Sequence, residues 1–280
     1  MTNDMASLNL CDIFGRLKQS TSNALTALLD RVPYKVIDRL YLGSYYCCNY
    51  FLQSQTEILE EILDFAKKSN RKVTLVVPPV FEKDFDRVCT KALRLIECYA
   101  QVIDELTIND FGALEFFSKN VNVKINYGRT MAKDSRDIRY EDFFQSTSTP
   151  RVFEPFYEKL LSSYQVGCVE LDCTHATIKI PEHKESLSVA VHIPYCYASI
   201  GSICEFAAVH RDGYNKFLYA GSCRCECNNM MIQCTYEENY NYLRLGRSVQ
   251  YENSSCIIDA TQPYRVIYTP VNELIVGGVL

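Results

Sequence analysis

The chain has 280 residues, of which 48% are apolar and 22% charged, and its formal net charge is −5. This is the composition of an ordinary globular protein, and the excess of acidic residues gives no overall attraction to nucleic acid. The N-terminus lacks a basic segment followed by an apolar run, and no stretch of about 18 apolar residues occurs, so we expect neither a signal peptide nor a transmembrane helix. Without secretion, the 14 cysteines indicate a reducing cytoplasm and a metal site rather than disulfides.

Residues 1–36 are predicted to form an N-terminal helical extension, because apolar residues recur there at helical spacing up to Pro33. From residue 37 onward, short apolar segments alternate with amphipathic ones. Strands are expected at 39–44, 73–77, 105–109, 121–126, 168–172 and 187–193. Helices are expected behind a capping-box sequence at 54–57 and at 85–99, 111–118 and 153–164.

This alternation predicts repeated βα units and therefore a parallel sheet with right-handed crossovers. So many strands fit a closed barrel better than a two-layer sandwich, so we expect residues 37–280 to form a TIM-type (β/α) barrel, incomplete or distorted in places. The functional groups of such barrels follow the C-terminal ends of the strands. Four unusual segments do so here, at 43–48, 109–112, 128–139 and the cysteine-rich loop region 196–234.

Three cysteines, Cys223, Cys225 and Cys227, fall within five positions of that last region. An extended segment points alternate side chains to opposite faces, so core packing does not require such a run. Thiolates instead favour zinc or an iron–sulfur cluster. Zinc sites prefer closely paired cysteines, and only Cys223 with Cys227 offers that spacing. The residues alone therefore leave both kinds of site open.

Other cysteines divide into candidates and core residues. Cys47 and Cys48 follow a glycine turn at the end of the first expected strand, where they are either ligands or small buried residues. Cys196 and Cys204 lie eight residues apart, which is not a zinc-knuckle spacing. Cys89 lies on the apolar stripe of a helix, so we expect it to pack in the core.

Three residues other than cysteine are candidates for binding a substrate. His192 lies at a strand end, where it either contacts a substrate or donates a proton, or is structural. Asn109 follows another strand. Arg129 begins a loop with four cations, which either hold a carboxylate or phosphate or pair with the acids of the same loop.

The segment from Val191 to Cys204 resembles the signature of the peptidase U32 family, which reads approximately H-G-x-x-C-x-x-x-S-G-x-C. The residues that match its fixed positions are His192, Cys196, Gly201 and Cys204. The two cysteines lie one residue further apart than in the signature, and Ile193 replaces its first glycine.

Other segments, within about residues 37–260, are similar to further motifs of that family. His210-Arg211-Asp212 resembles the H-R-D that many members carry before the next cysteine, and Cys223 with Cys227 matches a C-x-x-x-C found there. Residues 104–114 are similar to a strand-and-loop motif of the family. Residues 43–47 resemble the first-strand loop of the subgroup that acts in anaerobic ubiquinone hydroxylation. The family's late ligand cysteine has no counterpart at the same spacing, since Cys256 falls several residues early.

The resemblance implies a TIM-type barrel that carries an oxygen-sensitive [4Fe–4S] cluster, with zinc as the alternative. Three of the implied ligands match family positions, and they are Cys204, Cys223 and Cys227. The fourth is Cys47 or Cys196, and we prefer Cys47 because residues 43–47 keep the spacing of the family. Cys225 is a further alternative inside the cysteine run.

The implied activity is oxygen-independent hydroxylation, or another modification, of RNA or of a small aromatic molecule. The chain would act alone or with a second U32-like subunit, and Arg129 or neighbouring cations would hold the carboxylate of an oxygen donor. Two other functions stay open. One is a zinc-stapled scaffold or binding protein without catalysis, and the other is a peptidase or peptide-modifying protein, for which the sequence offers no catalytic dyad.

Overall fold

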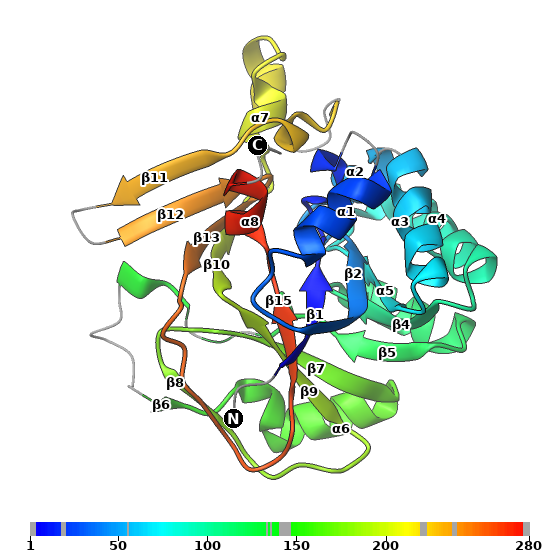
Figure 1. Ribbon diagram of the computed structural model, residues 1–280, viewed down its shortest axis with the longest axis vertical. Helices are drawn as coiled ribbons and strands as arrows, with labels where there is room; N and C mark the ends of the chain where they lie inside the picture. Colours follow the sequence, from blue (N-terminus) through cyan, green and yellow to red (C-terminus); the bar gives the residue numbers. More distant parts are fainter. Residues whose placement is uncertain are drawn as a thin grey trace.

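The computed structural model of the protein describes residues 4–17, 21–54, 56–132, 134, 136–139, 147–218, 223–236 and 240–276. Eight strands pair entirely in parallel and close into a barrel in the order in which they occur along the chain, with the last strand returning to the first (Figure 1). They are β1 (Met5–Asn9), β2 (Val36–Gly43), β3 (Lys72–Val77), β4 (Ile103–Ile108), β5 (Lys124–Tyr127), β7 (Val166–Asp172), β9 (Ser188–Ile193) and β15 (Arg265–Tyr268). The TIM-type barrel predicted from the sequence is therefore confirmed.

Helices cover the outside of this barrel. They are α1 (Thr21–Leu29), α2 (Cys48–Gln53), α3 (Thr56–Lys68), α4 (Phe85–Cys98), α5 (Phe111–Asn120), α6 (Pro155–Ser163) and α8 (Val271–Val276). A further short helix, α7 (Glu205–Ala208), lies away from the barrel strands (Figure 1). The longer helices are amphipathic: α3, for example, buries Ile58, Ile62 and Ala66 along one face. No helix in the described part of the chain is both long and apolar enough to cross a membrane.

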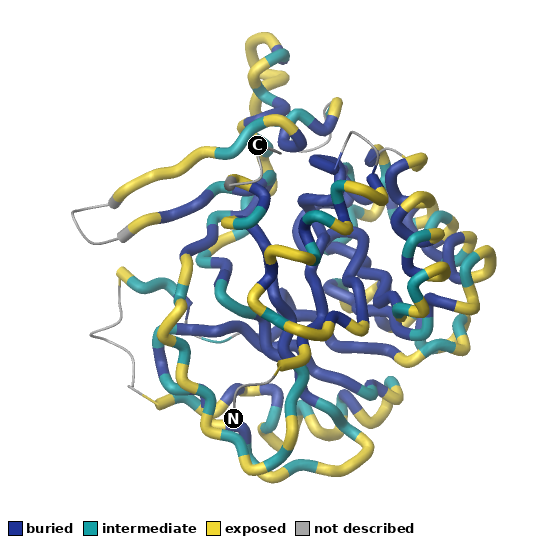
Figure 2. The backbone as a smooth tube through the Cα atoms, in the orientation of Figure 1, coloured by how far each residue is buried: buried dark blue, intermediate teal, exposed yellow. Residues whose placement is uncertain are grey.

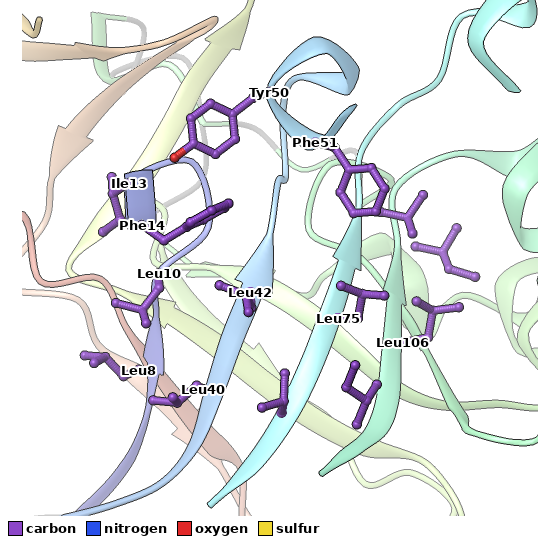
Figure 3. Packing of buried hydrophobic residues seen from close by; sticks show 14 of the residues in the cluster. Leu8, Leu10, Ile13, Phe14, Leu40, Leu42, Tyr50, Phe51, Leu75 and Leu106 are labelled. Atoms are coloured by element: carbon purple, nitrogen blue, oxygen red, sulfur yellow. The ribbon is translucent and has the colours of Figure 1, made fainter. Parts of the chain in front are cut away.

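Aliphatic residues on the outward face of the strands meet these helices. Leu8, Leu40 and Leu75 are fully buried on the neighbouring strands β1, β2 and β3. Figure 3 shows them in one layer with Leu42 and Leu106. Because burying one such side chain contributes about 1.5–3 kcal/mol, this layer holds strands and helices together. Figure 2 shows the barrel strands as the most continuously buried part of the chain.

The first barrel strand corrects the prediction for the N-terminus. Residues 5–9 form β1, one of the eight strands of the barrel wall, so the helical extension expected over residues 1–36 is wrong for these residues. Residues 21–29 form α1 and are helical as expected. Leu8 and Leu10 fit a helical spacing with later residues, but they belong to a short stretch of period two. The polar residues that alternate with them, Ser7 and Asn9, are also buried, because they face the inside of the barrel. An alternation of only five residues is too short to distinguish a strand from the helical spacing that the same residues share with later ones.

Two connections depart from the βα pattern. Residues 173–187, all of which are described, contain no helix but a strand, β8 (Thr177–Ile180), which forms a three-stranded sheet with β6 (Thr147–Ser148) and β14 (Ile258–Ala260). Between β9 and β15 lies an insertion with a four-stranded antiparallel sheet beside the barrel (Figure 1). Its strands are β10 (Tyr195–Ile200), β11 (Ile232–Tyr236), β12 (Tyr240–Leu245) and β13 (Ser248–Glu252). The cysteine-rich region is thus partly a sheet, and not only loop as expected.

The inside of the barrel is polar. Arg265 of β15 reaches across to Glu105 of β4, with Nη1–Oε2 and Nη2–Oε1 distances of 2.6 and 2.8 Å. Arg39 lies 3.5 Å from the same carboxylate. Burial opposes the ionisation of Glu105, but these two guanidinium groups outweigh it and lower its pKa to about 2.

This low pKa predicts acid sensitivity. A carboxylate whose pKa is lower in the folded than in the unfolded chain stabilises the fold above pH 4.5, and this stability is lost as the pH falls towards 2. We expect Glu105 to contribute a loss of about 2 kcal/mol between pH 5 and pH 3, measured by urea unfolding. The variant Glu105→Gln should lose that much less over the same interval, and equal losses in the two proteins would contradict the assignment.

Candidate functional site

Four cysteine side chains line one small cavity at the end of the barrel where β1 and β2 terminate. They are Cys47, which follows β2, and Cys204, Cys223 and Cys227 of the insertion. The rest of the lining consists of Asp12, Asn49, Tyr50, Glu226, Gly246 and Arg247. The fold therefore brings together the three predicted ligands of the insertion and, of the two predicted fourth ligands, Cys47.

The turn after β2 fixes Cys47. Gly43 has a φ of 125°, and a Cβ there would lie 2.3 Å from the carbonyl oxygen of Val76, so only glycine fits. The Cys47 N–H donates to Oγ of Ser44 at 2.9 Å, and Ser44 in turn donates to the carboxylate of Asp12. Cys47 is the N-cap of α2, where its sulfur accepts a hydrogen bond from the Tyr50 N–H at 3.4 Å. The sulfur is thus held at the cavity by the start of a helix.

The cysteine run turns sharply at its middle residue. Cys225 has left-handed backbone angles, φ 55° and ψ 42°, which are uncommon for any residue other than glycine. Cys223 and Cys227, on either side of it, line the cavity, whereas Cys225 does not; it is buried, and its N–H donates to the sulfur of Cys223 at 3.3 Å. Cys204 directly precedes α7; burial raises the pKa of its thiol, and the backbone N–H groups of Ala207 and Phe206 oppose this shift. The alternative ligand Cys225 is thus adjacent to Cys223, but it does not line the cavity with the four other thiols.

The cavity thiols influence one another. Burial raises the pKa of Cys227 well above its ordinary value, and the charges of Cys47, Cys223 and Cys204 would each raise it further. Burial also raises the pKa of Cys47 to about 12, and the nearby Arg247 opposes this shift. Four neutral thiols are therefore stable here as the chain stands, and a bound cation would be needed to hold them as thiolates.

Two arginines place positive charge beside the cavity. Arg247 lines it, and its Nε and Nη2 donate to the carbonyl oxygens of Gly201 and Ser202, both at 2.7 Å. Arg16 is only 3% exposed and donates to the carbonyl oxygen of Cys227 at 2.7 Å. Within the described part of the chain, its Nε and Nη1 are buried without a hydrogen-bond partner. A buried guanidinium group with no carboxylate partner is costly unless an anionic group lies close by.

These observations test whether the site fits a soft metal centre. Four cysteines with two flanking arginines form a donor set for a thiolate-bound, anionic centre. Among the described residues, no group of three or more His, Cys, Asp or Glu side chains is arranged as around a bound metal ion. The four sulfurs thus share the wall of one cavity without converging on a single point. Their chemistry fits the predicted centre, and metal binding stays a prediction.

Cys196 lies elsewhere. It belongs to β10, is fully buried, and packs with Cys173, Tyr242 and Tyr251 in a separate cluster. Cys89 packs in the main core on α4.

Arg129 is buried rather than at the surface of a loop. It is 1% exposed and pairs with the carboxylate of Asp172, to which Arg136 also binds. Its Nη2 donates to the carbonyl oxygen of Tyr195 at 2.7 Å. The interpretation that the cations of residues 128–139 pair only with acids of their own loop is thus wrong for Arg129 and Arg136. Asp172, at the end of β7, is their shared partner.

His192 and Asn109 are buried in hydrogen-bond networks. His192 lies inside the barrel with Nε2 3.0 Å from Oε2 of Glu170, and burial lowers the pKa of the imidazole well below its ordinary value, so it is neutral. Burial raises the pKa of Glu170 to about 7 against the hydrogen bonds that it accepts from Thr107 and Tyr45. Asn109 donates to the carbonyl oxygen of Val77 and accepts hydrogen bonds from Thr130. It thereby orders the loop after β5.

Sequence reasoning missed three charged residues of this region, which are Asp12, Arg16 and Arg247. Asp12 accepts hydrogen bonds from Ser44 and from the Tyr45 N–H, and burial raises its pKa to about 6. It lies shortly after β1, so recognising that strand would have marked Asp12 as a strand-end residue. No comparable local signal distinguishes Arg16 or Arg247 from other arginines.

Fold and cavity together define the protein as a TIM-type barrel with four cysteines gathered at the C-terminal end of its strands. No family model, no curated protein and no solved structure matches the chain. Its membership of the U32 family therefore stays a prediction from the sequence motifs.

Proposed function

We propose that this protein is a U32-like iron–sulfur protein in which Cys47, Cys204, Cys223 and Cys227 hold a [4Fe–4S] cluster. The observation that carries the proposal is that these four thiols line one cavity although they come from two distant parts of the chain. Either zinc or a cluster accepts four thiolates. The resemblance to the U32 family favours the cluster, and the buried charge of Arg16 favours an anionic centre of either kind.

The same proposal gives the protein a role in oxygen-independent hydroxylation or a related modification, as an enzyme or as the cluster-carrying subunit of one. A bound cluster supplies one-electron redox chemistry. The chain's own polar groups lie at the barrel end beside the cavity. Asp12 lines the cavity, and its carboxylate accepts a hydrogen bond from the N–H of Tyr45, in the segment after β2 that faces the barrel interior. Functional groups of TIM-type barrels lie at this end.

The buried charges favour a small anionic aromatic molecule over RNA as the substrate. Arg129 and Arg136 share the carboxylate of Asp172, so these three side chains together carry one positive charge. Nε of Arg129 and the hydroxyl of Tyr46 are buried without a hydrogen-bond partner among the described residues. These two donors would bind and orient a carboxylate. RNA recognition instead needs an extended basic surface, and the net charge of the chain is −5.

Anaerobic purification with metal and sulfide analysis tests the proposal. We expect a brown protein with about four irons and as many acid-labile sulfides per chain. About one zinc per chain without sulfide would support the zinc-stapled scaffold instead. A protein with neither metal, after reconstitution with iron and sulfide under reducing conditions, would refute both.

A further inference from the structure

A second group of cysteines lies outside the four-thiol cavity. Cys173 directly follows β7, and Cys256 lies in the connection between β13 and β14. Cys173 is fully buried, whereas Cys256 is partly exposed and packs against the cluster that contains Cys173. The two side chains pack in one cluster and interact with each other, although they are far apart in the sequence.

The backbone on both sides of this pair is held in place. Nδ2 of Asn253 donates to the carbonyl oxygens of Cys173 and Thr174, at 3.1 and 2.8 Å. Beyond Cys256, the carbonyl oxygen of Ile257 accepts a hydrogen bond from the Ile178 N–H at 2.9 Å, where β14 begins to pair with β8. The two segments thus run side by side before any bond forms between the sulfurs. A contact ordered in this way lowers the conformational cost of closing a disulfide.

The two thiols have different surroundings. Burial raises the pKa of Cys173 well above its ordinary value, and the sulfur lies 3.3 Å from the carbonyl oxygen of Pro194. Interaction with the Cys173 side chain lowers the pKa of Cys256, against the effects of burial and of Asp172. An accessible thiol of lowered pKa beside a buried thiol is the arrangement of an attacking and a resolving cysteine.

We propose that Cys256 and Cys173 form a thiol–disulfide exchange site whose substrate is a small disulfide of the glutathione type. The Cys256 thiolate attacks one sulfur of oxidised glutathione, which forms a mixed disulfide and releases one glutathione thiolate that takes up a proton. Cys173 then loses its proton and attacks the Cys256 sulfur, which releases the second glutathione. The pair loses two electrons and two protons, and one oxidised glutathione becomes two reduced molecules.

The bond would tie the insertion to the end of β7, next to Asp172. That carboxylate is the shared partner of Arg129 and Arg136. The exchange site is independent of the proposed cluster, because none of the four cavity thiols takes part in it.

Peptide mapping tests this site directly. The protein, purified anaerobically with its bound metal, is incubated with oxidised glutathione, alkylated and digested with trypsin. Cys256 is the only cysteine in the tryptic peptide 248–265, and Cys173 lies in peptide 160–179 with Cys168, from which fragmentation separates it. We expect these two peptides to be linked through Cys173 and Cys256. In Cys173→Ser, and equally in Cys173→Ala, we expect a stable glutathione adduct on Cys256 instead.

The exposed Cys98 provides the matched control. Its variant Cys98→Ser should form the link as the parent protein does, and Cys256→Ser should form none. The proposal is overturned if the parent protein keeps a glutathione adduct on Cys256 without the link, or if Cys256 reacts no faster than Cys98. Because the readout is a peptide mass, it does not depend on whether iron is bound.

Discussion

Serine in place of Cys227 is expected to reduce the iron in anaerobically purified protein to background, whereas serine in place of Cys225 leaves it unchanged. The two residues belong to the same short run, but of the two only Cys227 lines the cavity. An alkoxide or hydroxyl group is a harder donor than a thiolate and does not replace it well for iron or zinc. The pair of variants therefore separates a ligand from its neighbour at almost the same place in the chain.

A second pair of serine variants, at Cys47 and Cys196, decides which of these two residues is the fourth ligand. We expect Cys47→Ser to lose iron and Cys196→Ser to retain it, because Cys196 lies in the separate cluster with Cys173 and Tyr251. Iron per folded chain, measured with circular dichroism as the folding control, is the readout. Full iron retention in both Cys47→Ser and Cys227→Ser would remove the four-cysteine assignment, and loss of iron only in Cys196→Ser would move the ligand to the other cluster.

Asparagine in place of Asp172 is expected to lower the free energy of unfolding by about 3–5 kcal/mol, because the guanidinium groups of Arg129 and Arg136 would remain buried without their counter-charge. Urea unfolding at neutral pH measures the change. The control is Lys35→Ala, which removes an ion pair with Asp4 whose two side chains are largely exposed. Such a pair contributes no more than about 1 kcal/mol.

Similar losses in the Asp172 and Lys35 variants would show that the buried cluster contributes no more than an exposed pair. Arg129, as the buried partner of Asp172, is expected to be needed for stability as well.

The alternation of apolar and amphipathic segments was enough to predict the barrel, because a strand buried on its outer face and a helix with one apolar stripe leave different periods in the sequence. Strands β2 to β5, β7 and β9 lie where that pattern predicts them. It failed for β1, whose five residues also fit a helical spacing. It failed again for the antiparallel sheet of the insertion, where strands such as β11 are largely exposed and carry no clear apolar alternation.

Some residues of the candidate site could likewise be predicted from the sequence, and others only from the folded chain. The spacing of Cys223 and Cys227, and the resemblance to the U32 motifs for Cys204, mark these three residues as a group before the structure is known. The choice between Cys47 and Cys196 depends on which distant segments meet, and only the closed barrel brings the end of β2 against the insertion after β9. Arg129 likewise meets Asp172 through the neighbouring positions of β5 and β7. Local sequence determines periodicity and spacing, whereas burial, ion pairing and long-range contacts arise only when the strands close into the barrel.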